Sequence, residues 1–96
     1  MTTKAELGLG ALYHATLAQN ADQIIKQGIK PLAWLTTTRE EAYVIISDYK
    51  FDSKAEAGSI KVFKVNLPGN WELRKSVGDE YISNTTIPPK YLRLLI

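Results

Sequence analysis

Cysteine is absent from the 96 residues, and histidine occurs only once. Without a thiol the chain can form no disulfide, offer no thiolate nucleophile and hold no cysteine-ligated metal. Most zinc sites need two or more imidazole or thiolate ligands, so a single imidazole argues against a zinc centre as well. No nucleophile-elbow pattern surrounds any serine, which argues against a hydrolase triad. We therefore expect no metal cofactor.

Long hydrophobic runs are also missing. A membrane-spanning helix requires about 18 consecutive apolar residues, and no such stretch occurs. The N-terminal segment has no uninterrupted apolar stretch of signal-peptide length. From this we expect a cytoplasmic protein with no membrane partner.

The composition is that of one globular domain. A hydrophobic content of 45% is too high for a disordered chain, and 96 residues leave no room for a second core. Gly8 and Gly10 suggest that residues 1–10 are a flexible lead-in to a domain at 11–96. Twelve basic and ten acidic residues give a net charge of only +2, and they are scattered, so the charge is only a weak indication of a polyanion partner.

Two helices are expected in the N-terminal half. The first has Asn20 as its N-cap, Gln23 completing a capping box, and Gly28 just past its end. Ile24 and Ile25 are its expected inner residues.

The second helix starts after Thr38, which forms a capping-box pattern with Glu41. Its expected inner residues are Ala42, Ile45 and Ile46. The polar segment at 48–58 is expected to be a loop.

Strands are expected at residues 12–14, 33–36, 59–67, 71–75, 81–82 and 91–96. The strand at 59–67 has Ile60 and Val62 on one face and Phe63, Val65 and Leu67 on the other. A strand that is apolar on both faces is typical of the centre of a sheet. The element order predicts an α+β fold with mostly antiparallel pairing.

Three short segments carry a family resemblance: residues 12–16 (LYHAT), 34–37 (WLTT) and 80–82 (EYI), the last followed by a hydrophobic strand. In this order they resemble the signature segments of the ADP-ribosyltransferase superfamily. The similarity is to the His-Tyr-Glu branch, which includes the poly(ADP-ribose) polymerases and small bacterial and phage enzymes. The three segments span most of the chain.

The resemblance implies a small split β-sheet that binds NAD as co-substrate. In the family the histidine, here His14, donates a hydrogen bond to a ribose hydroxyl. The residues after it, here Ala15 and Thr16, contribute to binding the cofactor, with backbone groups holding the nicotinamide amide. Trp34 stands where the family usually has a tyrosine that packs on nicotinamide, and Thr36 is implied as a pocket residue. Ala15 replaces the glycine found in many members.

The resemblance also implies that Glu80 is catalytic together with His14. Breaking the bond between ribose and nicotinamide builds positive charge on the sugar, as glycoside cleavage does. A fixed carboxylate stabilises that charge more in the transition state than in the ground state. Glu80 would also orient an acceptor or take its proton. The implied function is transfer of ADP-ribose from NAD to a protein or nucleic-acid acceptor, with release of nicotinamide.

Each of these residues also has a structural interpretation. The structural interpretation of His14 is a partly buried residue at a strand end, that of Trp34 a core or surface-anchoring tryptophan, and that of Glu80 a solvated turn. The alternative function is therefore a non-catalytic domain of the same fold that binds a nucleotide, nucleic acid or partner protein. A basic, aromatic sheet face for single-stranded nucleic acid is a further candidate, formed by Lys61, Lys64, Arg74, Lys75, Lys90 and Arg93 with Tyr81 and Tyr91.

Overall fold

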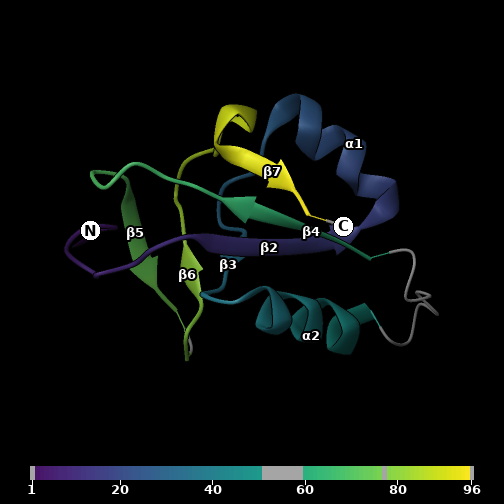
Figure 1. The fold of residues 1–96 in the computed structure, drawn as a ribbon, viewed down its shortest axis with the longest axis horizontal. Coiled ribbons are helices and arrows are strands. Elements are labelled where there is room, and N and C mark those ends of the chain that lie inside the picture. The colour runs from purple at the N-terminus through teal and green to yellow at the C-terminus, as the bar shows by residue number, and fades with distance from the viewer. Residues whose placement is uncertain (1, 51–59, 77, 96) are drawn as a thin grey trace.

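The structure, a computed structural model, describes residues 2–50, 60–76 and 78–95. It consists of two antiparallel sheets with two α-helices (Figure 1). The four-stranded sheet has the order β1 (Thr2–Thr3), β5 (Glu72–Lys75), β6 (Tyr81–Ile82), β3 (Trp34–Leu35). The three-stranded sheet has the order β2 (Leu12–Leu17), β4 (Ile60–Val65), β7 (Leu92–Leu94). The predicted α+β class and antiparallel pairing are confirmed.

Among the described residues, one isolated bridge joins the two sheets, between β2 and the residue after β3. Tyr13 N–H donates to the carbonyl of Thr36 at 2.8 Å, and Thr36 N–H donates to the carbonyl of Tyr13 at 2.9 Å. The strands of the two sheets are otherwise paired separately. We call the junction between β2 and β3 the split.

The central position of β4 is confirmed, because this strand pairs with both β2 and β7. Side chains on the two faces of β4 pack in different hydrophobic clusters. Ile60 and Val62 pack with α2 residues in one cluster, whereas Val65 lies in a larger cluster on the opposite face. That larger cluster contains Leu12, Ile29, Leu35, Val65, Leu67, Leu73, Tyr81 and Ile87.

Helix α1 (Ala18–Gln27) begins earlier than predicted. Its N-cap is Leu17, which makes no side-chain capping bond, so the prediction of Asn20 as the cap is wrong. The reason is that β2 remains paired with β4 up to Leu17, and the chain passes directly from strand to helix. The predicted end is confirmed: Gly28 has a φ of 86°, and its N–H donates to the carbonyl of Ile24 at 2.8 Å. Ile25 is 47% exposed and is not an inner residue.

Helix α2 (Arg39–Lys50) has the predicted cap, because Glu41 N–H donates to the Thr38 hydroxyl at 3.2 Å. Ala42 and Ile46 are buried, as predicted. The helix continues through residues 48–50, which were expected to be loop, and residues 51–58 of that expected loop lie outside the described residues. No helix among the described residues is both long and apolar enough to cross a bilayer.

Within the lead-in expected at 1–10, residues 2–9 contact the rest of the fold. Thr2–Thr3 forms the edge strand β1, paired with β5. Leu7 and Leu9 pack against the larger core, and the Lys4 ammonium donates to the carbonyl of Leu67 at 2.7 Å. At the other end, the expected strand at 91–96 is divided into a 3-10 turn, η3 (Pro89–Tyr91), and the short strand β7.

Candidate functional site

The side chain of His14 lies at the split between the two sheets. His14 is in β2, and its ring nitrogen Nδ1 lies 2.8 Å from the carbonyl oxygen of Trp34 in β3. The two rings are also in contact, with centroids 5.0 Å apart and planes tilted by 50°. The imidazole therefore links β2 to β3 beyond the isolated bridge.

These contacts settle which nitrogen of His14 carries the proton. A carbonyl oxygen can only accept, so Nδ1–H must be the donor. Burial lowers the pKa of His14 because it penalises the charged ring, and the bond to the Trp34 carbonyl opposes that effect in part. The neutral ring then presents a lone pair at Nε2.

His14 lines a cavity. No hydrogen bond joins Nε2 to another described residue. His14 is one of the residues lining a cavity of about 270 Å³ between β2, α1 and the segment after α1. This volume is below the roughly 300–1,000 Å³ of pockets for drug-sized ligands, so it suits one end of a dinucleotide.

The lining of this cavity combines polar side chains with the apolar Ile24, Ile29 and Ala33. Three carboxamides of α1, from Asn20, Gln23 and Gln27, line it together with Lys30. No Asp or Glu is among the described lining residues. Sequence reasoning interpreted Asn20 and Gln23 as capping residues and missed this role. The signal that could have found it is their spacing with Gln27, because residues at i, i+3 and i+7 share one helix face.

Glu80 lies next to β3 on the side opposite to β2 and His14. Ser76 N–H donates to the Glu80 carbonyl at 2.8 Å, which extends the pairing of β5 and β6 by one residue. The Glu80 side chain is half-buried, and no described residue donates a hydrogen bond to its carboxylate. Glu80 does not line the cavity that His14 lines.

Strand β3 separates the two candidate catalytic residues. Tyr81 is opposite Leu35, which sets Glu80 beside Thr36, two residues along β3 from the carbonyl that His14 contacts. With about 3.3 Å per residue along a strand and about 4.8 Å between strands, the Glu80 and Trp34 backbones are on the order of 8 Å apart. An extended dinucleotide is longer than this separation.

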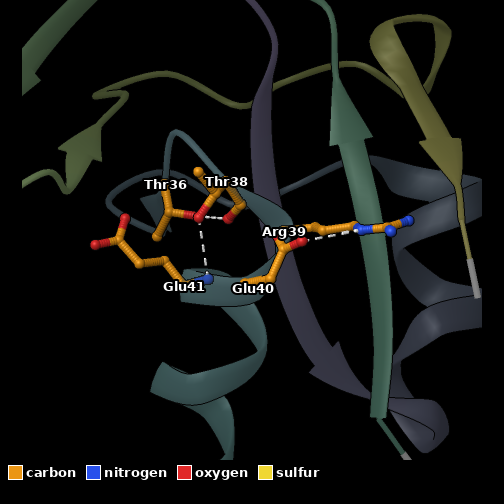
Figure 2. A network of polar contacts seen from close by, with 5 residues as sticks. All are labelled: Thr36, Thr38, Arg39, Glu40 and Glu41. Carbon is orange, nitrogen blue, oxygen red and sulfur yellow. Dashed lines mark hydrogen bonds and ion pairs between the residues drawn. The ribbon is translucent and has the colours of Figure 1, made fainter.

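The remaining predicted cofactor residues lie in β2, in β3 or directly after β3, around the split. Ala15 is fully buried against α2, opposite Val62 in β4, and Thr16 is buried one position further along. Trp34 is half-buried and packs on the same α2 cluster. Thr36 is fully buried, and its hydroxyl donates to the carbonyl of Thr38 at 2.7 Å (Figure 2). Thr36 thus supports the turn into α2 and lines neither of the cavities beside it.

No protein-family model and no curated protein matches this sequence. Among the residues that the structure describes, no three His, Asp or Glu side chains gather as metal ligands would.

Proposed function

We propose that this protein binds NAD at the split between its two sheets and transfers ADP-ribose to an acceptor, releasing nicotinamide. The observation that carries the proposal is the state of His14. A neutral imidazole, fixed by the carbonyl of Trp34 and keeping an acceptor at Nε2, lines a cavity of nucleoside size together with three carboxamides. Ribose hydroxyls are suitable donors to such an acceptor.

The lining residues suit the adenosine and diphosphate parts of NAD. His14 Nε2 accepts a hydrogen bond from a ribose hydroxyl, the reverse of the donor role implied by the family resemblance. Carboxamides of Asn20, Gln23 and Gln27 both donate and accept, as the edges of adenine require. Lys30 provides a positive charge for the diphosphate, and the lack of lining carboxylates avoids repulsion of that anion.

Glu80 supplies the catalytic carboxylate in this proposal. The bond between ribose C1′ and the nicotinamide nitrogen breaks, and nicotinamide leaves with the bonding electrons. A bond forms between C1′ and a nucleophilic oxygen or nitrogen of the acceptor, whose proton passes to Glu80 or to water. The negative charge of Glu80 stabilises the positive charge that develops on the sugar.

A non-catalytic domain that binds a nucleotide is the second candidate. The observation that favours it is that Glu80 does not line the His14 cavity. In that case adenine nucleotides bind, but nicotinamide is never released. The two candidates therefore differ in turnover and not in binding.

Binding is tested by titrating NAD, ADP-ribose, AMP or nicotinamide into the protein and measuring the melting temperature and the heat of binding. We expect NAD, ADP-ribose and AMP to bind, because the cavity holds their shared adenosine part. Nicotinamide alone should bind much more weakly. Binding of nicotinamide but not AMP would contradict the assignment of this cavity.

Two substitutions of His14 give a matched pair. His14→Asn keeps an N–H donor at the δ position, facing the Trp34 carbonyl, but removes the nitrogen at the ε position. His14→Gln places its amide near the ε position and loses the δ donor. We expect His14→Asn to fold normally and to lose about tenfold or more in AMP affinity, the loss of about one hydrogen bond in a buried site. Unchanged AMP affinity in a folded His14→Asn protein would contradict the proposed contact.

A further inference from the structure

A second surface feature lies on the opposite side of the three-stranded sheet from α1. Two cavities adjoin one another beside α2, with volumes of about 560 Å³ and about 380 Å³. They share Arg39, Glu40 and Leu95 as lining residues, so they form one continuous groove over β4 and the end of β7. We call this feature the α2 groove. It is separate from the cavity lined by His14.

One end of the α2 groove is cationic. Lys64 of β4 lines it and lies directly opposite Tyr13 on one side and Arg93 on the other. Directly opposite side chains project from the same face of a sheet, and two like charges in that position repel each other. Lys64 and Arg93 therefore concentrate positive charge where the fold itself gains nothing from it.

Arg39 adds a third cation in the part of the groove that the two cavities share, where Glu40 also lies. Figure 2 shows its side chain extending from the first turn of α2 across β4. Its Nε lies 3.4 Å from a carboxylate oxygen of Glu40, but both side chains are more than 60% exposed, with 66% and 73% of their surface accessible. Such an exposed pair contributes at most about 1 kcal/mol, so the guanidinium remains available to a stronger anion.

The other end of the groove is apolar. The ring of Tyr43 and the side chains of Val44, Val62 and Leu95 line it, and Val44 is 54% exposed. Tyr43 is half-buried, which leaves part of its ring accessible. An aromatic ring next to a cationic patch is the pattern that binds a base and its phosphate.

We propose that the α2 groove binds single-stranded nucleic acid, with phosphates at Lys64, Arg93 and Arg39 and a base against Tyr43. This inference rests on the proposed function, since it identifies the acceptor of the transfer. The strand register connects the two: Lys64 is opposite Tyr13, Tyr13 bridges Thr36, and Glu80 lies beside Thr36. Three strand spacings of about 4.8 Å separate Lys64 from Glu80, or about 14 Å in all.

Fewer residues share one face of the sheet than the sequence suggested for the basic, aromatic surface. Side chains alternate between the two faces along a strand, so residues three positions apart lie on opposite faces. Lys61 therefore projects from the face of β4 opposite to that of Lys64. Tyr81 is buried and offers no stacking surface. Of that set, Lys64 lines the groove, and Arg93 projects beside it from the same face of the sheet.

The test measures binding of short fluorescein-labelled oligothymidylate and oligouridylate in the absence of NAD. We expect wild-type protein to bind with an affinity that falls as salt rises. Lys64→Gln should lower the slope of log affinity against log salt by about 0.7, the value for one lost phosphate contact on a single strand. Lys64→Glu and Arg93→Glu should each weaken binding by roughly tenfold or more, as should Tyr43→Ala.

Lys61→Glu is the matched control, because it makes the same change of charge on the same strand but on the opposite face. It should leave oligonucleotide affinity nearly unchanged. The proposal is overturned if wild-type protein does not bind oligonucleotides, if Lys61→Glu and Lys64→Glu weaken binding equally, or if polyglutamate competes more strongly than the oligonucleotides do.

His14→Asn separates this proposal from the proposed function. It should retain oligonucleotide binding while losing AMP. Oligonucleotide binding without any NAD binding refutes only the proposed function. NAD cleavage without oligonucleotide binding refutes only the assignment of the groove.

Discussion

His14 donates its Nδ1–H to the carbonyl oxygen of Trp34, 2.8 Å away, across the gap between the two sheets. This bond has a structural effect and a chemical one. It links β2 to β3 beyond the isolated bridge, and it leaves the opposite nitrogen, Nε2, as an acceptor on a side chain that lines the cavity under α1.

Stability should fall as the pH is lowered through the range where a free histidine titrates. Burial holds the pKa of His14 below its value in the unfolded chain, so the unfolded state takes up a proton first. The stabilisation from neutral His14 is thus fully present above about pH 6.5 and is lost as the pH falls below it. Urea unfolding of wild-type protein should show a slope of up to about 1.4 kcal/mol per pH unit. His14→Asn should remove most of that slope between pH values of about 5 and 7, and an unaltered slope would rule out His14 as its source.

Gly28→Ala should destabilise the protein by at least about 3 kcal/mol. A Cβ at Gly28 would overlap the carbonyl of Ile87, and the φ of 86° is itself unfavourable for alanine. The carbonyl is held by Ile29 N–H at 2.9 Å, so it has little freedom to move away. Denaturant unfolding measures the loss.

Gly8→Ala is the control, since Gly8 has a similar φ of 69° but nothing within 4 Å of an added Cβ. It should cost only about 1 kcal/mol, the price of the left-handed conformation alone. Equal losses for the two variants would show that the contact with Ile87 is unimportant.

Leu32→Asn should stabilise the protein by about 0.5–1 kcal/mol. Leu32 has a φ of 69°, which leucine adopts at a cost and asparagine tolerates. Its side chain is 61% exposed, so little hydrophobic burial is lost. For a domain of this size the melting temperature should rise by a few degrees. Leu32→Ala removes the same side chain without favouring this conformation, so a gain as large as that of Leu32→Asn would refute the explanation.

The elements that were predicted correctly are those that local residue patterns determine. Apolar residues on both faces of β4 indicated a central strand, and Thr38 with Glu41 indicated the start of α2. The start of α1 was missed because pairing of β2 with β4 continues to Leu17, and tertiary pairing of this kind overrides a capping motif at Asn20.

The candidate site was less predictable, because it depends on contacts between distant segments. The sequence singled out His14 but could not show that its Nδ1 would be paired with the backbone of Trp34, 20 residues away. The carboxamides of α1 were recognisable only by their shared helix face. The juxtaposition of Lys64 and Arg93 depends on the register of β4 with β7, two strands that lie far apart in the sequence.

The central claim is that Glu80 acts on NAD held by His14, and the most direct test measures nicotinamide release by wild-type protein and Glu80→Gln, with NAD affinity measured in parallel. We predict that Glu80→Gln retains NAD binding while its rate of release falls by about 100- to 1,000-fold, because the variant keeps the shape but loses the charge that stabilises the sugar cation. Nicotinamide release by Glu80→Gln at the wild-type rate, or its complete absence from wild-type protein saturated with NAD and supplied with cell lysate as a source of acceptors, would contradict the claim.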